Sequence, residues 1–241
     1  MRLSLVGRLV DASNGTFLAR DEDDESLWVY KPVAGEAPLW DFTEATLGRR
    51  EVAAYALSEH LGLGVVPLTV WVDGPLGEGS AQAWVEGEAT ELIDLISPEA
   101  LTEEWMPVLA AETEDGEPIL LAHRDDPRLR AVALFDALLN NSDRKASHLI
   151  ADGERLAGVD HGVSLHVDDK LRTVLWGWAG DPLTAEEQAI CAATARLDSP
   201  LAPGLHDDEW AALSARATAM LEAGAFPLPS GRWPSIPWPP L

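Results

Sequence analysis

The stretch NNSDRKASHLIADGERLAGVDHG, residues 140–162, decides how the fold is interpreted, because polar and charged side chains are densest here. It follows a long apolar segment and contains HLIADGERLAGVD, which predicts a short hairpin turning at Asp152–Gly153. Such a hairpin would bring Asp160 back to the neighbourhood of Asp143. Two carboxylates, together with His148 and a second histidine, would then converge on one cleft.

Converging carboxylates and histidines suit phosphoryl transfer, in which one carboxylate orients a hydroxyl and another holds a divalent cation on the phosphates. The distribution of charge agrees with this interpretation. Residues 128–172 contain seven basic and seven acidic residues, so the remainder of the chain carries the whole net charge. An anionic nucleotide would meet its least repulsive surface here. A solvated loop of mixed charge also explains the spacing.

The whole chain is strongly acidic, since 17 basic residues against 41 acidic ones give a net charge of −24 over 241 residues. A surface of this sign repels nucleic acid and anionic bilayers, so we expect neither nucleic-acid binding nor stable membrane association. Cys191 is the single cysteine, which excludes an intrachain disulfide and a multi-cysteine zinc site. No signal peptide or membrane-spanning run is recognisable. We therefore expect a cytoplasmic protein.

The N-terminal third predicts a sheet with one helix. Residues 47–61 are rich in helix formers and are followed by Gly62 and Gly64, which favour a helix end there. The acidic run 21–25 is typical of a solvated hairpin connection. Composition predicts strands in five segments, at 3–10, 15–20, 26–33, 65–72 and 79–87.

The remaining chain predicts mostly helices. Residues 90–127 contain helical patches, 127–141 are apolar nearly all round as in a buried helix, and two more helices are expected near 184–197 and 207–223. The last segment, 225–241, has six prolines and can be neither helix nor sheet. It is either a disordered extension or an arm pinned by its two tryptophans.

Several motifs in a fixed order resemble those of the phosphatidylinositol-kinase-like superfamily. They are VYKP at 29–32, REVAAY at 50–55, SDRKASH at 142–148 and GVDHG at 158–162. The phrases KPVAGEAPLWDF and HVDDKLRTVLWGWAG make the chain similar to an actinobacterial family of hypothetical proteins related to phosphatidylinositol 3-/4-kinases, with HipA-type kinases as distant relatives. The resemblance covers about residues 5–200.

The resemblance implies an α+β, two-lobed, atypical-kinase fold. Its small β-rich N-lobe would span residues 1–88, its mainly helical C-lobe residues 89–224, and its Pro/Trp-rich tail residues 225–241. The active site would lie at the junction of the two lobes.

The resemblance also implies a role for each matching residue. Lys31 would contact the α- and β-phosphates of ATP, and Glu51 would pair with Lys31. Asp143 would be the catalytic base, and Asp160 would hold Mg²⁺ or Mn²⁺. The phosphate-covering turn would comprise Ser13, Asn14, Gly15 and Thr16, the adenine hinge would comprise Trp84, Val85 and Glu86, and 168–177 would be the activation or substrate-recognition loop.

The chain departs from the family pattern near its metal site. The position five after Asp143 usually holds asparagine, a metal ligand, and here it is His148, beside Asp160 in the expected metal set. Neutral imidazole suits Mn²⁺ or Zn²⁺ better than Mg²⁺. The turn after Asp160 reads Asp160–His161–Gly162, which alters a packing residue, and Lys145 stands where many relatives have histidine.

From the residues alone, other interpretations stay open. Lys31 is also explained as an edge-strand lysine that discourages aggregation. Glu44 and Glu59 rival Glu51 as its partner, and Asn140–Asn141 are also explained as the cap of a helix.

The sequence thus predicts an ATP-dependent phosphotransferase whose acceptor is a protein hydroxyl or a soluble metabolite. A phosphoinositide acceptor fits poorly, because only Lys170 and Arg172 would stand in the recognition loop of a very acidic protein. The alternative favoured by His148 is a pseudokinase that binds nucleotide as a regulatory or scaffolding module. A metal-dependent hydrolase would use the same Asp/His cluster but leaves Lys31 unexplained.

Overall fold

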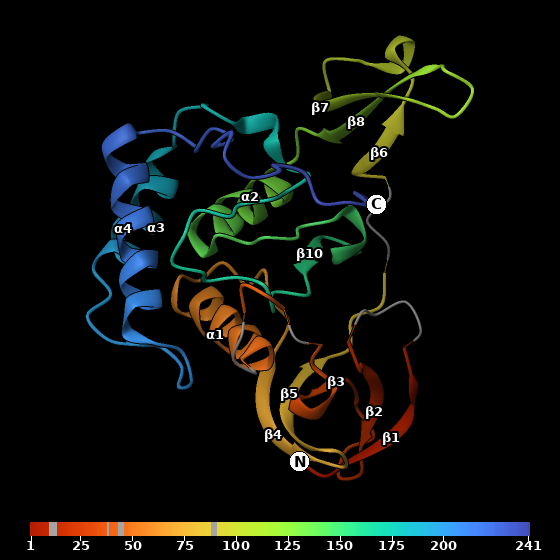
Figure 1. Cartoon of the computed structure of the whole chain (residues 1–241), viewed down its shortest axis with the longest axis vertical. Helices are drawn as coiled ribbons and strands as arrows, with labels where there is room; N and C mark the ends of the chain where they lie inside the picture. The colour runs from red at the N-terminus through yellow and green to blue at the C-terminus, as the bar shows by residue number, and fades with distance from the viewer. Residues whose placement is uncertain (10–13, 38, 43–45, 88–90) are drawn as a thin grey trace.

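A computed structural model describes residues 1–9, 14–37, 39–42, 46–87 and 91–241, and these form a mixed α/β structure (Figure 1). Five antiparallel strands of the N-terminal part make one sheet in the order β1-β2-β3-β5-β4. They are β1 (Leu3–Arg8), β2 (Phe17–Asp21), β3 (Leu27–Pro32), β4 (Thr69–Gly74) and β5 (Gly77–Ala83). The strands predicted in this part are confirmed, and the acidic run 21–25 joins β2 to β3 as expected.

Alternation along β3 determines which of its side chains face the core. Trp28 and Tyr30 are buried on one face, whereas Val29 and Lys31 lie half-buried on the other. The sheet packs against helix α1 (Leu47–His60), which contacts β4 and β5. This helix matches the one predicted over residues 47–61, and it carries Glu51.

The stretch after residue 90 differs from the expectation of helical patches. It forms β6 (Ile93–Ile96), β7 (Trp105–Glu112) and β8 (Pro118–Arg124), an antiparallel sheet in the order β6-β8-β7. Its first strand pairs with β8, which follows about 25 residues later, so the pairing is not visible in local composition. This sheet projects from the molecule at the end opposite the five-stranded sheet (Figure 1). The part after residue 88 therefore contains more strand than the resemblance implied.

Helix α2 (Pro127–Leu139) is the centre of the hydrophobic core, as its apolar sequence predicted. Asp126 caps its first turn by accepting a hydrogen bond from the Arg128 N–H at 2.8 Å. Asn140 ends it in the left-handed conformation, with φ of 57°. The predicted hairpin is present as β9 (Leu149–Asp152) and β10 (Arg155–Gly158).

Two C-terminal helices, α3 (Ala185–Ala195) and α4 (Asp207–Ala223), pack side by side along one flank of the molecule (Figure 1). Both were predicted. A buried ion pair between Arg50 of α1 and Glu209 fastens α4 to the N-terminal part of the chain. Within the described ranges, no helix combines the length and apolar character needed to cross a membrane. The domain boundaries near residues 88 and 224 stay predictions.

The proline-rich tail folds back across the molecule without forming helix or strand, as predicted (Figure 1). Prolines lack an N–H but keep a carbonyl, and the tail uses its carbonyls as acceptors. Ser235 O accepts from the Trp176 indole at 2.7 Å, and Pro240 O accepts from the Ala146 N–H at 2.9 Å. Trp233 packs on the main body, but Trp238 is 78% exposed. The expectation that both tryptophans pin the arm is therefore wrong for Trp238.

A buried histidine joins β8 to the loop before α3. Gly177 donates its N–H to His123 Nε2 at 3.0 Å, so Nε2 is an acceptor and the proton lies on Nδ1, which faces the Arg124 carbonyl at 2.9 Å. Burial lowers the pKa of His123, although the Arg124 carbonyl and Asp125 oppose this effect. Protonation would remove the acceptor that Gly177 uses.

We expect the free energy of unfolding to fall as the pH falls from 7 to 5, and His123→Gln to weaken that dependence. The unfolded chain protonates this side chain near its ordinary pKa of about 6.5, whereas the folded state resists, so acid favours unfolding by up to about 1.4 kcal/mol per pH unit. Urea unfolding at each pH measures the slope. The control is His60→Gln at the exposed end of α1. Equal slopes for the two variants would show that His123 does not cause the pH dependence of stability.

Candidate active site

Lys31 stands between two carboxylates that come from separate elements. Its Nζ contacts a carboxylate oxygen of Glu51 on α1 and lies 2.8 Å from Asp160 Oδ1. Glu51 is buried, and its other oxygen accepts the backbone N–H of His161 at 3.0 Å. Of the rival partners, Glu59 is exposed and Glu44 lies outside the described residues. The Lys31–Glu51 contact implied by the resemblance is thus present.

These contacts fix the charge states of the cluster. Burial alone would lower the pKa of Lys31, but the Asp160 and Glu51 carboxylates outweigh it and raise the pKa above its ordinary value. The Lys31 ammonium in turn holds the pKa of Asp160 well below the usual range. At neutral pH the site therefore presents one ammonium and an ionised, 51% exposed Asp160. Asp160 also has φ of 60°, a left-handed backbone that aspartate tolerates and that often marks functional turns.

Asp143 is held at the start of the loop that follows α2. Its N–H donates to Asn141 Oδ1 at 3.1 Å, and its carboxylate lies 3.4 Å from Lys145 Nζ. Asn141 in turn donates to Asp136 inside α2 at 2.9 Å. The two asparagines that sequence suggested as a helix cap therefore do two things, because Asn140 ends the helix and Asn141 orients the loop.

A fully buried ion pair supports the same loop, and sequence reasoning missed it. Arg144 donates two hydrogen bonds to Asp136, at 2.8 and 2.9 Å, and neither side chain is exposed. The guanidinium also donates to the Val159 carbonyl at 2.9 Å and lies 2.7 Å from His161 Nε2. Arginine only donates, so Nε2 of His161 accepts, and burial together with the Arg144 charge lowers the pKa of His161. A lone aspartate within the otherwise apolar residues 131–139 of α2 was the available signal.

His148 lies beside Asp160, as the sequence predicted, with Nε2 3.5 Å from Asp160 Oδ2. Burial lowers its pKa, which favours the neutral form that can bind a metal. Its Nδ1 is buried and has no hydrogen-bond partner among the described residues. Within the same residues, no group of three or more His, Cys, Asp or Glu side chains could hold a metal by itself. Asp160 and His148 could therefore hold a metal only together with other ligands, such as phosphate oxygens and water.

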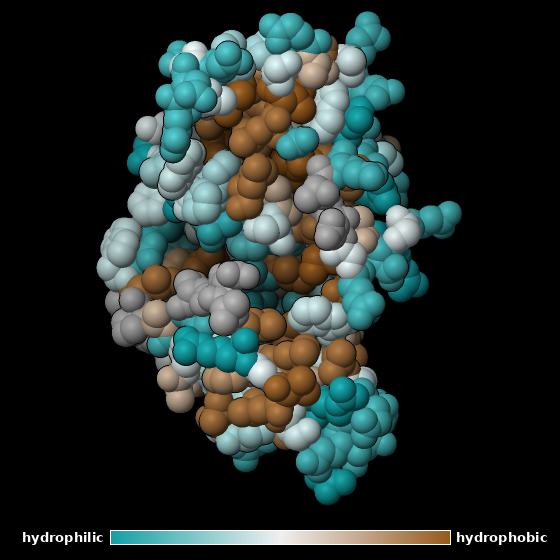
Figure 2. Space-filling model, turned by 90° about the vertical axis from the view of Figure 1, so that its right-hand side faces the viewer, coloured by the Kyte–Doolittle hydropathy of each residue, from teal (hydrophilic) through white to brown (hydrophobic). Residues whose placement is uncertain are grey.

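Two cavities meet at Lys31, Asp143 and Asp160. The first, which we call the strand cavity, has a volume of about 560 Å³. Its lining contains three cations, and apolar residues from the five-stranded sheet and from the region after α2. The apolar residues include Val29, Ala83, Val85, Ile150 and Val159, and the cations are Arg8, Lys31 and Lys145. The surface is visibly hollowed between the two parts of the molecule, with hydrophilic residues inside the hollow (Figure 2).

The second, which we call the aromatic cavity, has a volume of about 330 Å³. Its walls include Trp40 and Phe42 from the segment before α1, and Trp233 from the tail. It shares Asn14 with the strand cavity, in addition to the three residues at which the two meet. Any molecule in one cavity would therefore end close to a molecule in the other.

The structure distributes the remaining predicted site residues between these cavities. Trp84 and Val85 line the strand cavity, Gly15 and Glu51 line the aromatic cavity, and Glu86 lines neither. Ser13 lies outside the described residues.

The turn around Gly15 differs from the expected phosphate cradle. Its N–H donates to the Gly35 carbonyl at 2.8 Å, and a Cβ on Gly15 would lie 3.0 Å from the Gly35 Cα. The glycine is used for this close approach, so its N–H is not available to a phosphate.

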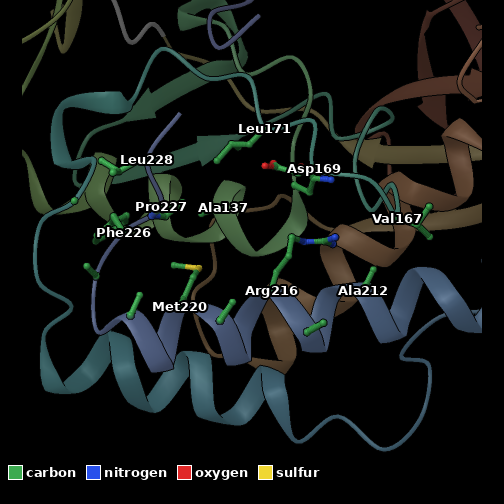
Figure 3. A pocket seen from close by; sticks show the side chains of 16 residues that line it. Ala137, Val167, Asp169, Leu171, Ala212, Arg216, Met220, Phe226, Pro227 and Leu228 are labelled. Carbon is green, nitrogen blue, oxygen red and sulfur yellow. The ribbon is translucent and has the colours of Figure 1, made fainter. Parts of the chain in front are cut away.

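A further cavity of about 810 Å³ lies away from these residues, between α4, α2 and the segments around Val167 and Phe226 (Figure 3). Its cation, Arg216, donates to the Leu138 and His166 carbonyls at 3.0 and 3.1 Å. Burial lowers the pKa of Arg216 to about 10. Its Nε and Nη1 donate these two bonds and so fasten α4 to the core, whereas Nη2 is buried and has no hydrogen-bond partner among the described residues.

The chain is 44% identical over 256 residues to Protein Rv2133c of Mycobacterium tuberculosis, and the match covers 98% of this chain and 91% of that protein. The chain belongs to the Rv2133c family. No protein-family model matches this member of the Rv2133c family. Among solved structures, it is similar to the Helicobacter pylori proinflammatory kinase CtkA over 93% of this chain and 92% of that one, with 10% identity and a TM-score of 0.44. That likeness is too distant to carry an activity across.

In this Rv2133c-family chain we expect Arg144→Met to lower the free energy of unfolding by about 3–5 kcal/mol. The change leaves Asp136 as a buried, uncompensated carboxylate. Urea unfolding measures the loss. The control, Arg20→Met, removes an exposed pair with Glu25 and should cost less than about 1 kcal/mol. Similar losses in the two variants would show that the Arg144–Asp136 pair is not the anchor of the loop.

Proposed function

We propose that this protein is an ATP-dependent phosphotransferase with a two-lobed, atypical-kinase architecture. The observation that carries the proposal is the Lys31 ammonium held between Glu51 and Asp160, at the point where two cavities meet beside Asp143. A strand lysine paired with a helix glutamate, next to a metal-binding aspartate, is the arrangement that kinases use to position phosphates. The resemblance of the four motifs supports the same proposal.

The strand cavity fits a nucleotide by size and by charge. Its volume of about 560 Å³ falls within the range of about 300–1,000 Å³ typical of small-molecule sites. Apolar side chains such as Val29 and Ile150 suit a purine, and three cations against two carboxylates line the same space in a chain of net charge −24. Trp84 and Val85 would then lie beside the base, and Lys31 beside the phosphates.

In the proposed reaction Asp143 accepts the proton of an acceptor hydroxyl. As the proton leaves, the hydroxyl oxygen bonds to the γ-phosphorus of ATP, and the bond from that phosphorus to the β,γ-bridging oxygen breaks. The electron pair of the broken bond stays on ADP, and the proton passes from Asp143 to solvent. Lys31 offsets the charge of the phosphates while Glu51 keeps it in place.

Asp160 and His148 would hold Mg²⁺ or Mn²⁺ in this site. Such a cation, when bound, neutralises phosphate charge and orients the γ-phosphoryl group. The neutral state of His148 and the ionised state of Asp160 are the forms that can bind a metal.

A second candidate function rests on His148 itself. Imidazole at this position, in place of asparagine, suits a pseudokinase that binds nucleotide and transfers nothing. Stabilisation by nucleotide together with absent transfer would favour this regulatory module.

We expect Asp143→Asn and Asp160→Asn to fail in different ways. Loss of the base in D143N should lower the rate of phosphate transfer by about 10²–10⁴-fold while ATP still binds. Loss of the metal ligand in D160N should abolish the gain in ATP affinity that Mg²⁺ or Mn²⁺ provides. Calorimetric titration and transfer of labelled phosphate measure the two effects. The control is Asp152→Asn on the hairpin turn, and a D160N protein that binds metal and ATP like the parent would refute the metal role.

We expect His148→Asn to shift the metal preference from Mn²⁺ towards Mg²⁺, because an amide oxygen is the harder ligand. The measurement is the ratio of ATP-induced thermal stabilisation in Mg²⁺ to that in Mn²⁺, with His60→Asn as the control. A ratio that does not change would remove His148 from the metal site. Transfer that appears only in H148N would favour the pseudokinase for the natural chain.

A further inference from the structure

The aromatic cavity lies on the other side of Lys31, Asp143 and Asp160 from the strand cavity. If the strand cavity takes the nucleotide, the γ-phosphate ends where the two cavities meet. A hydroxyl in the aromatic cavity would then lie beside Asp143, the proposed base. The position of the aromatic cavity therefore makes it the candidate acceptor site.

The size of this cavity limits what it can hold. A volume of about 330 Å³ is at the lower end of the range for small-molecule sites. Part of its wall comes from the chain's own tail, through Trp233, whose ring centroid lies 6.1 Å from that of Trp40. A small molecule is therefore favoured over the hydroxyl of a protein.

The cations around the aromatic cavity differ in whether they have a carboxylate partner. Lys170 lies 2.7 Å from Asp41 and is stacked against Trp40 and Trp233, at 4.7 and 5.1 Å from their ring centroids. Five carboxylates among the described residues line the cavity, and each has a partner: Asp41 pairs with Lys170, Asp143 with Lys145, and both Glu51 and Asp160 with Lys31, while Glu36 accepts from the N–H groups of Leu47 and Gly48. Arg172 also lines the cavity. Its Nη2 lies 3.4 Å from the Ile236 carbonyl, and it has no carboxylate partner in the part of the chain that the structure describes. An arginine in this position favours an anion, and it suits a carboxylate or phosphate group best.

Three of the ten buried side-chain atoms that have no hydrogen-bond partner among the described residues belong to residues of the same cavity. Among the described residues, Ser142 Oγ, Arg172 Nε and Trp233 Nε1 are buried and form no hydrogen bond. All three residues line the aromatic cavity, and Ser142 immediately precedes the proposed base. A buried donor without an acceptor is costly, so these groups point to a ligand that supplies oxygen acceptors.

We propose, on the basis of the proposed function, that the acceptor is a small hydroxylated anion bound in the aromatic cavity, with Trp233 of the tail as part of its site. Its anionic group would bind Arg172 and its hydroxyl would face Asp143. In the transfer, the hydroxyl oxygen bonds to the γ-phosphorus, its proton goes to Asp143, and ADP leaves with the electron pair of the broken bond. The products are a phosphate monoester and ADP.

The first test measures ADP release with ATP, Mn²⁺ or Mg²⁺, and four sets of acceptors. The sets are small hydroxycarboxylic acids and sugar phosphates, neutral polyols of matched size, serine- and threonine-containing peptides, and vesicles that contain inositol lipids. Stimulation by the hydroxylated anions alone is expected. Stimulation by peptides, by vesicles or equally by the neutral polyols would overturn the proposal.

The second test uses two variants of one tail. Trp233→Ala should raise the KM for the most effective acid by about tenfold and change the Kd for ATP by less than about twofold. Trp238→Ala is the matched control, because Trp238 is a tryptophan of the same tail and is 78% exposed. Equal acceptor KM values in the two variants would overturn the role of Trp233. Thermal unfolding with and without ATP verifies that each variant is folded.

Arg172→Gln gives a separate test that does not disturb the tail's tryptophans. It should reduce the preference for hydroxylated anions over polyols by about 10–100-fold. An unchanged preference would remove Arg172 from the site.

The failures of the two proposals are distinguishable. If ATP does not bind, the proposed phosphotransferase is wrong. If ATP and metal bind but no acceptor set stimulates ADP release, the acceptor proposal is overturned and the nucleotide-binding module is favoured.

Discussion

The site depends on the carboxylate of Glu51, which connects two other elements of the chain to helix α1. One oxygen contacts the Lys31 ammonium and the other accepts the His161 N–H at 3.0 Å, while the side chain is almost wholly buried. A buried carboxylate without such donors would cost several kcal/mol, so the two donors are required rather than optional. They come from β3 and from the turn after β10. Sheet, helix and turn must therefore be in place together before any one of these contacts is stable.

Buried and exposed charged residues have different roles around Glu51. Arg144 and Asp136 are inaccessible to solvent and connect α2 to the carbonyls and histidine that surround the hairpin β9–β10. Asp143 and Asp160 are partly exposed and line both cavities. The buried pair fixes the backbone, so the two exposed carboxylates, which repel each other, keep their positions. Reactive groups held by a rigid, buried support are what phosphoryl transfer needs.

Local patterns predicted the elements whose causes are local. Helices α1, α2, α3 and α4 and the hairpin β9–β10 follow from periodicity, caps and turn residues. The sheet β6-β8-β7 was missed because β6 pairs across an intervening strand, which composition does not reveal. The pair Asp136–Arg144 was missed for a similar reason, since a lone acid in the apolar part of a helix has no visible partner until the chain folds. The resemblance implied the Lys31–Glu51 contact and assigned Asp160 to the same site, but the wall made by Trp233 depends on how the tail returns.

Electrostatic screening bears on how so acidic a chain could offer the proposed site for anions. At physiological ionic strength the Debye length is about 8 Å, so the exposed carboxylates of the far surface are largely screened from a ligand in either cavity. The potential that such a ligand meets is instead set by the charges within a few ångströms of it. Arg8, Lys31 and Lys145 line the strand cavity, and Arg172 lines the aromatic cavity. The net charge of −24 then acts mainly on large, extended polyanions such as nucleic acid or a membrane surface, which cannot place all their charges within the cavities. Carboxylates also line both cavities, Asp143 and Asp160 in each and Glu36, Asp41 and Glu51 in the aromatic cavity, so a small anion would have to bind at the few cations that it can reach directly. The acidic surface thus selects against large polyanions, whose charges would extend beyond these cations.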